Sequence, residues 1–197
     1  MKIGNYLLEA GKTMAGAALI LLILKFTGLL GSVSYVTQSA VLQTGLMNAS
    51  GEQMSTDESF DYNFMIKDLT GTKINFEQYK GKVVFINLWA TWCGPCRAEM
   101  PGIQKLYDKV DHDKISFVML SIDKDVNKDK VVKFISDRSF SFPTFMPSGY
   151  LSSQLNVPNI PTSFIISKDG KIVVKEIGMK NYDTSKFKKL LEKLASE

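Results

Sequence analysis

The sequence has few of the residues that form disulfide cross-links or bind metal ions, with two cysteines and one histidine in 197 residues. A disulfide framework needs several well-spaced cysteines, whereas Cys93 and Cys96 stand close together in the chain. A zinc site usually needs four ligands, mostly Cys and His, and His112 is the only histidine. We therefore predict no structural disulfide framework, no bound metal and no cofactor.

The charged residues are also too evenly mixed for a nucleic-acid-binding protein. The formal net charge is only +4, and the lysines are scattered among Asp and Glu instead of forming an Arg-rich stripe. Hydrophobic residues make up 45% and charged residues 22%, which is ordinary for a globular protein. A chain of this length allows one ordinary domain with an additional segment.

One long apolar stretch stands at the N-terminus. Residues 13–24 are uncharged and mostly apolar, Lys25 interrupts, and a second apolar run continues to residue 36. Because roughly 20 apolar residues cross a bilayer core, we predict that residues 1–36 form a transmembrane anchor, with Lys25 reaching toward an interface. Two alternatives stay open, a signal peptide cleaved near Ser32 and a buried or interfacial helix.

Charges around this stretch predict its orientation. Lys2 and Lys12 precede the span, and nothing charged follows Lys25 until Glu52. The positive-inside rule then places the N-terminus in the cytoplasm and the rest of the chain on the extracytoplasmic, periplasmic side.

Residues 37–59 are mostly small and polar without a clear period, which predicts a flexible tether. Residues 60–197 carry the patterns of a folded domain. Apolar or alternating runs predict strands at Tyr62–Ile66, Lys73–Phe76, Val83–Trp89, Ile115–Ile122, Thr162–Ser167 and Lys171–Glu176. Helical spacing predicts helices at Cys93–Val110, Asn127–Arg138, Tyr150–Leu155 and Asp183–Ala195. This order predicts an α/β fold with a mixed central sheet flanked by helices.

The chemistry is predicted to lie in Trp92-Cys93-Gly94-Pro95-Cys96, where a buried strand gives way to a helix. A cysteine at a helix N-terminus faces unpaired N–H groups and the positive end of the helix dipole, which stabilise a thiolate. A thiolate attacks a disulfide, and Cys96 one turn later resolves the mixed disulfide. Pro95 fits the first turn because its missing N–H costs little there. The alternative is a pair of inert buried thiols.

The run WATWCGPCRAEMP, residues 89–101, resembles the active site of the thioredoxin superfamily. It is most similar to the membrane-anchored TlpA-like branch, which includes the thioredoxin-like proteins of cytochrome c maturation. Such proteins carry a cis-proline facing the two cysteines, and Ile160-Pro161 before an apolar strand matches that pattern. The resemblance covers roughly residues 60–197. It implies a thioredoxin-like fold and a cis Ile160–Pro161 bond whose backbone pairs with a substrate strand beside Cys93.

The predicted substrate-binding surface also includes the residues around the nucleophile. We assign Trp92 to the rim of this surface, with Gly94 and Pro95 between the cysteines, whereas Trp89 is predicted to be core. Met146 and Pro147, in an insertion before the last strands, are equally consistent with a substrate-facing segment and a surface loop.

One position departs from thioredoxin itself. Where thioredoxin has a buried Asp thought to handle the proton of the resolving cysteine, this chain has Asn87, which does not titrate. Glu99 matches a Glu of the TlpA-like motif that is assigned a comparable role, and it shares a helix face with Cys96. The hypothesis is that Glu99 assists proton transfer at Cys96. An ordinary first-turn Glu favoured by the helix dipole is the alternative.

Gly94-Pro95 is the dipeptide of reducing thioredoxins, which favours a reductase over an oxidant. The resemblance implies disulfide-containing protein substrates, such as apocytochrome c or another exported protein, and a membrane thiol transporter as electron donor. We predict a monomer without nucleic acid. Two other classes remain, a thioredoxin-fold peroxidase and a binding or chaperone module without activity. The peroxidase frame P-x-x-x-T-x-x-C lacks its proline, since Asn87, Leu88 and Trp89 fill that stretch.

Overall fold

The computed structural model describes residues 3–26, 37–53 and 58–197. Within these residues, seven strands form one sheet in the order β2-β1-β5-β4-β3-β6-β7. They are β1 (Met65–Asp68), β2 (Lys73–Asn75), β3 (Val83–Trp89), β4 (Ile115–Ser121), β5 (Thr144–Pro147), β6 (Thr162–Ile166) and β7 (Ile172–Ile177). Strand β4 runs parallel to β3 and β5, and the remaining neighbours pair antiparallel. The predicted mixed sheet is confirmed.

Strand β3 lies at the centre of the domain because its side chains are apolar apart from Asn87. All seven residues are buried, and β3 pairs with β4 and β6. Its side chains alternate between the two faces of the sheet. Phe85 and Trp89 belong to one core cluster, whereas Ile86 and Leu88 belong to the other. The end of this rigid strand therefore fixes where the following residues lie.

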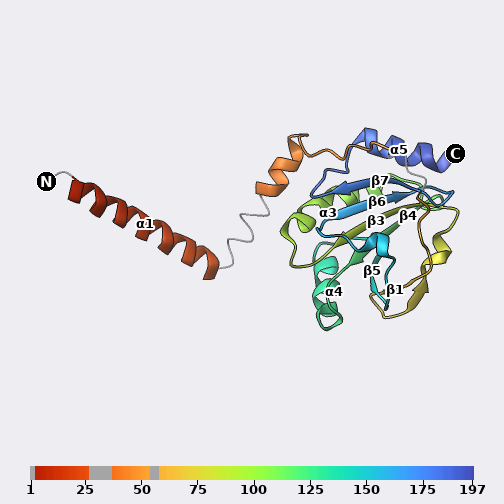
Figure 1. Ribbon diagram of the computed structural model, residues 1–197, viewed down its shortest axis with the longest axis horizontal. Helices are drawn as coiled ribbons and strands as arrows, with labels where there is room; N and C mark the ends of the chain where they lie inside the picture. Colours follow the sequence, from red (N-terminus) through yellow and green to blue (C-terminus); the bar gives the residue numbers. More distant parts are fainter. Residues whose placement is uncertain (1–2, 27–36, 54–57) are drawn as a thin grey trace.

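Three helices cover one face of the sheet: α3 (Gly94–Tyr107), α4 (Lys128–Asp137) and α5 (Ser185–Ser196) (Figure 1). Each places its apolar stripe on the same core cluster, with Met100 from α3, Phe134 from α4 and Leu191 from α5 among the buried side chains. The opposite face is covered by the chain before β3, where Phe60, Tyr62, Phe64 and Phe76 pack ring against ring.

The remaining differences from the sequence prediction lie at short elements. The predicted helix at Tyr150–Leu155 is a single 3-10 turn, Ser153–Leu155. The segment containing Met146 and Pro147 is strand β5, paired with β4 and β1, so it is not a surface loop. A proline at the end of a four-residue run hides the strand pattern, since proline cannot donate to a ladder.

The N-terminal helix α1 spans Ile3–Phe26 and stands apart from the domain in Figure 1. Among the described residues, no helix is long and apolar enough to cross a membrane. Helix α1 covers only part of the expected anchor, residues 1–36. The helix contains Glu9, Lys12 and Lys25, which limits its uncharged stretch to residues 13–24, fewer than the roughly 20 that cross a bilayer core. The rest of the predicted anchor, residues 27–36, lies outside the described residues.

Part of the predicted tether is attached to the domain. Residues 37–43 are helical, and Leu42 and Ala49 are buried. The backbone N–H of Ala49 donates to the carbonyl oxygen of Asn181 at 3.0 Å, and the Asn181 N–H donates to the Met47 carbonyl at 2.7 Å. The described part of residues 37–59 is therefore not flexible throughout, as the predicted tether would be.

Candidate active site

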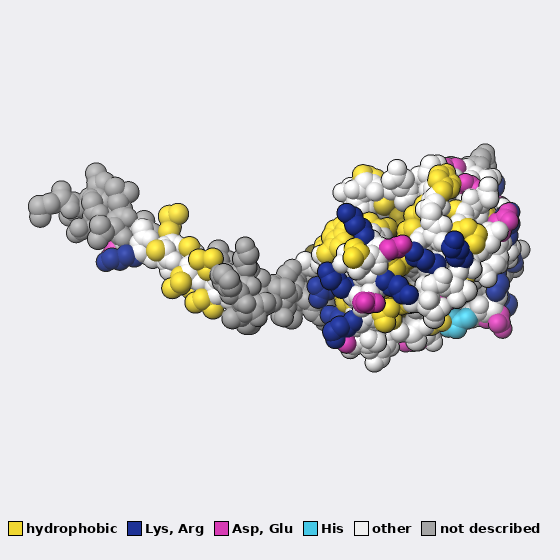
Figure 2. All heavy atoms as spheres, turned by 90° about the horizontal axis from the view of Figure 1, so that it is seen from below, with side chains coloured by type: hydrophobic (Ala, Val, Ile, Leu, Met, Phe, Trp, Pro, Cys, Tyr) yellow, Lys and Arg dark blue, Asp and Glu magenta, His cyan; other side chains and the backbone are white. Residues whose placement is uncertain are grey.

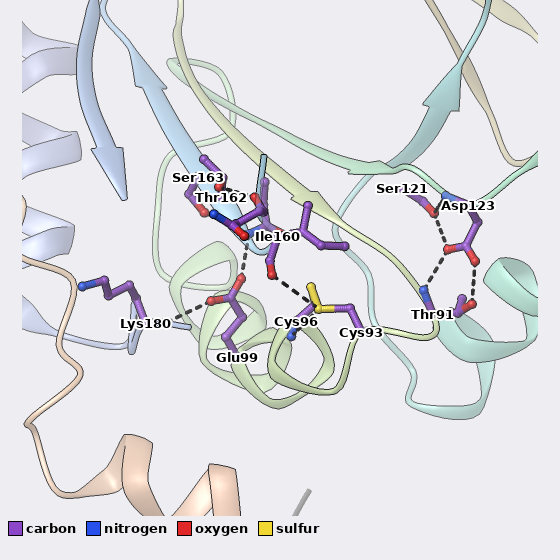
Figure 3. Close-up of a disulfide and its surroundings, with 12 residues drawn as sticks. Thr91, Cys93, Cys96, Glu99, Ser121, Asp123, Ile160, Thr162, Ser163 and Lys180 are labelled. Atoms are coloured by element: carbon purple, nitrogen blue, oxygen red, sulfur yellow. Dashed lines mark hydrogen bonds between the residues drawn. A yellow bond between two sulfur atoms is a disulfide. The ribbon is translucent and has the colours of Figure 1, made fainter. Parts of the chain in front are cut away.

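The two cysteines lie at the start of α3, shortly after the end of β3. Cys93 is the N-cap of α3 with extended backbone, and Pro95 lies in the first turn. The Cys96 N–H donates to Cys93 Sγ at 3.2 Å, so one of the unpaired amides at the helix start points at this sulfur. The cysteines form a disulfide with their Cα atoms 5.3 Å apart (Figure 3).

The two sulfurs differ in access to solvent. Cys93 retains 6% of its surface, whereas Cys96 is fully buried. Trp92, immediately before Cys93, is 67% exposed, while Trp89 is fully buried in the core as predicted. Cys93 is therefore the more accessible of the two cysteines, and it lies next to the exposed Trp92 ring.

The predicted cis bond between Ile160 and Pro161 is confirmed. It stands directly before β6, the strand that pairs with β3, and this placement brings residues far apart in the sequence to the disulfide. The Ile160 carbonyl oxygen lies 3.9 Å from Cys93 Sγ (Figure 3). A disulfide sulfur carries no proton, so this is a contact that becomes a hydrogen bond only when the reduced Cys93 holds its proton.

Gly94 lies beside the N-terminal segment. A Cβ atom built on Gly94 would lie 3.6 Å from the side-chain amide of Gln38. The helical residues 37–43 therefore border the disulfide as well as the domain, a neighbour that the sequence did not predict.

Glu99 is the most unusual ionisable group near the cysteines. It is fully buried on α3, one turn after Cys96. Its Oε1 accepts from Asn87 Nδ2 at 2.8 Å, and its Oε2 accepts from the backbone N–H of Lys180 at 3.0 Å (Figure 3). Burial raises the pKa of Glu99 to about 8, although these hydrogen bonds and the Lys180 charge oppose the shift. Glu99 is therefore not the ordinary exposed first-turn glutamate of the alternative interpretation.

Asn87 links Glu99 to the sheet. It lies on β3 and is fully buried, and its Nδ2 also donates to Ser163 Oγ on β6 at 2.9 Å. Position 87 thus holds a neutral hydrogen-bond donor, and the ionisable side chain that it contacts is Glu99.

A second polar cluster supports the loop before Cys93, and sequence reasoning missed it. Asp123, only 5% exposed, accepts from the Thr91 N–H at 2.8 Å and from Thr91 Oγ1 at 2.7 Å. Ser121 Oγ donates to the same carboxylate at 2.8 Å. The sequence did contain a signal for this cluster, because the polar residues Ser121 and Asp123 stand at the end of the buried strand β4. This end of β4 lies beside the end of β3. In the described part of the chain, no three His, Cys, Asp or Glu side chains gather to hold a metal ion.

Several known proteins are similar to this chain. Thiol-disulfide oxidoreductase ResA of a Bacillus cereus strain is 40% identical over 117 residues, 59% of this chain and 66% of that protein. This match spans just under two thirds of that relative. Thioredoxin-like protein YneN of Bacillus subtilis (strain 168) is 32% identical over 162 residues, 82% of this chain and 86% of the relative.

The fold comparison agrees with the sequence comparison. The crystal structure of StoA from Bacillus subtilis is similar with a TM-score of 0.54 and 29% identity, covering 64% of this chain and 94% of that one. A family model described as the AhpC/TSA family matches residues 61–175, more than half of the chain, including both cysteines and the cis-proline. This chain, with its thioredoxin-like fold, therefore belongs to the AhpC/TSA family.

Proposed function

We propose that this chain is a thiol–disulfide oxidoreductase that reduces disulfide bonds of other proteins through Cys93 and Cys96. The observation that carries the proposal is the cysteine pair at the start of α3, facing the cis Ile160–Pro161 bond. The similarity to ResA, a thiol-disulfide oxidoreductase, and to YneN, a thioredoxin-like protein, supports it.

In the proposed reaction the reduced Cys93 thiolate attacks a substrate disulfide. One substrate sulfur leaves as a thiolate, and a mixed disulfide joins Cys93 to the other. Cys96 then loses its proton and attacks Cys93 Sγ, which releases the second substrate sulfur. Two electrons and two protons pass to the substrate, and the product is the Cys93–Cys96 disulfide of Figure 3. A dithiol donor must then reduce this disulfide for another turnover.

The assignment of Cys93 as the attacking sulfur follows from its surroundings. Its sulfur accepts the Cys96 N–H and lies at the positive end of the α3 dipole, and both effects stabilise a thiolate. Cys96 is fully buried, so a substrate disulfide in solvent does not contact its sulfur directly. This division assigns the resolving step to Cys96, and we place Trp92, Gly94, Pro95, Ile160 and Pro161 around the bound substrate.

Glu99 is proposed to accept the proton of Cys96. With a pKa of about 8, Glu99 is mostly protonated at neutral pH, and its ionised fraction increases as the pH approaches 8. This pKa is close to the roughly 8.5 of an ordinary thiol, so ionised Glu99 takes the proton of Cys96 at little cost. The substitution Glu99→Gln should slow resolution of the mixed disulfide and change its pH profile. A merely structural Glu99 would leave that profile in place, and unchanged cysteine pKa values with an unchanged exchange rate would end the assignment.

The direction of the reaction is tested by the reduction potential of the pair. A value of about −250 mV or lower makes the protein a reductase, and one near about −120 mV makes it an oxidant. Loss of exchange in Cys93→Ser, with the fold retained, argues against a binding or chaperone module. Rapid consumption of hydrogen peroxide would instead favour the peroxidase.

We also propose that residues 1–36 hold the domain on the extracytoplasmic side of a membrane, where a membrane thiol transporter delivers electrons. The support is the apolar composition of residues 13–36 and the lysines before it. Extraction of membranes at alkaline pH tests the anchor. The full chain should stay with the lipid, whereas a chain lacking residues 1–36 should be released.

A further inference from the structure

A basic hollow borders the cysteine pair on the side of Trp92. It encloses about 420 Å³ between the loop before α3 and the helix α4, and the side chains used below are Trp92, Arg97, Lys130, Lys133, Phe134 and Arg138. We call this surface the α4 hollow. Figure 2 views the domain from below, the side on which α4 lies in Figure 1, and Lys and Arg side chains gather on that face.

The acidic side chains that line the α4 hollow are already engaged. Asp123 accepts the hydrogen bonds that hold Thr91, and Asp137 pairs with Lys133 at 2.9 Å. Within the described ranges, Arg97, Lys130 and Arg138 have no carboxylate partner. The α4 hollow therefore carries positive charge that the described part of the domain does not neutralise.

Both guanidinium groups are held in place by one aromatic ring. The Cζ atoms of Arg138 and Arg97 lie 4.2 and 5.7 Å from the centroid of the Phe134 ring, which is 8% exposed. A guanidinium that stacks on a ring keeps N–H donors at its edge for a carboxylate. The Arg97 Nε is buried and finds no acceptor among the described residues. Two like charges on one ring would be relieved by a carboxylate between them.

The position of the α4 hollow ties it to the reacting sulfur. Trp92 directly precedes Cys93, and Arg97 follows Cys93 by one helical turn on α3. A polypeptide whose disulfide meets Cys93 can therefore reach the α4 hollow across Trp92.

We propose that the α4 hollow docks an acidic segment of the protein that exchanges disulfides with Cys93–Cys96, with Asp or Glu side chains beside its reacting cysteine. This inference rests on the proposed function. The occupant is a polypeptide because Trp92, 67% exposed, adds apolar contact area to the charges. Arg97, Lys130 and Arg138 provide the donors for its carboxylates.

The test compares two disulfide-bonded peptides that differ only in residues flanking one cysteine, Asp and Glu in one and Ser and Gln in the other. The reduced full-length protein is mixed with each, and the exchange rates are measured at low salt and at about 0.5 M salt. We expect the acidic peptide to react about tenfold faster at low salt. This ratio should fall toward one at high salt, because screening removes the attraction.

Two double variants with equal charge change locate the effect. In Lys130→Gln/Arg138→Gln the ratio of the two rates should fall to about a third or less of its original value. In Lys186→Gln/Lys189→Gln, on the distant helix α5 (Figure 1), it should stay within about a third of the original. The ratio is taken within each protein, so a change in the folded fraction cancels. Lys130→Glu alone, which changes the charge by the same amount as the first double variant, should lower the ratio to a similar extent.

Each contrary result has a separate meaning. Equal rates for the two peptides in the unmodified protein would overturn the docking site while leaving the oxidoreductase in place. Equal losses in the α4 and α5 variants would show that the preference depends only on the overall charge of the protein. That result would also overturn the docking site. Failure to reduce either peptide would instead refute the proposed function.

Discussion

Replacing Glu99 by Gln should remove a pH dependence from the stability of the domain. The carboxylate is fully buried, and burial is the largest cause of its raised pKa. The folded state therefore binds the Glu99 proton more tightly than the unfolded state does. Stability from this group is fully present below the unfolded pKa and is lost as the pH rises through the folded pKa. Gln resembles the protonated acid in shape and in having one acceptor and one donor group.

The magnitude follows from the two pKa values. The ordinary pKa of a glutamate is 4.5, and that of Glu99 is about 8. Since one pKa unit corresponds to about 1.4 kcal/mol, this carboxyl lowers the free energy of unfolding by about 1 kcal/mol at pH 5 and about 3 kcal/mol at pH 7. At pH 9 the loss is about 5 kcal/mol, after which it levels off.

The assay is urea unfolding of the oxidised protein from pH 5 to pH 9, for the unmodified chain and for Glu99→Gln. Keeping the disulfide intact prevents the cysteines from titrating. Burial also raises the pKa of Tyr182 well above its ordinary value, so this neighbour stays neutral in that range. The difference between the two stability curves should grow by about 3–4 kcal/mol. Parallel curves would refute the reasoning, because they would show that Glu99 titrates alike in the folded and unfolded states.

Three further predictions concern the resolving cysteine, the loop support and the N-terminal segment. Cys96→Ser should trap a mixed disulfide with a substrate, seen as a band that a reductant removes; no such band would contradict its resolving role. Asp123→Asn should cost about 1–3 kcal/mol in urea unfolding, because one buried donor loses its acceptor; an unchanged midpoint would contradict this support. Glu176, only 5% exposed, accepts from the Ser50 N–H and hydroxyl at 2.6 and 2.7 Å, so Glu176→Ala should speed cleavage after Glu52 by a glutamyl endopeptidase. Equal cleavage rates would mean that these bonds do not hold the segment.

The centre of the fold could be predicted from sequence because its signals are local. The run Val83–Trp89 is apolar throughout apart from Asn87 and became the central strand with the predicted bounds. Helix α3 begins one residue after the predicted start, with Cys93 as its cap. The cis bond at Pro161 was implied by resemblance alone, since nothing in local spacing connects this residue to Cys93.

What could not be predicted depends on contacts between distant segments. Strand β5 is short and ends in Pro147, and only its pairing with β1 and β4 makes it a strand. The support of Thr91 by Asp123 requires the ends of β3 and β4 to lie side by side, which follows from their parallel pairing. Likewise, the attachment of residues 48–51 depends on partners more than a hundred positions away.

The N-terminal segment at residues 37–43 contributes to a second pocket near the cysteine pair. On the α4 side, basic groups face solvent beside Trp92. On the other side, Ser39, Leu42 and Gln43 line a pocket of about 300 Å³ together with Glu99. An acid keeps a raised pKa only while water is excluded from it. Because Ser39, Leu42 and Gln43 border that pocket, we expect the segment that leads into the domain to help exclude water from Glu99 and so to keep its pKa raised.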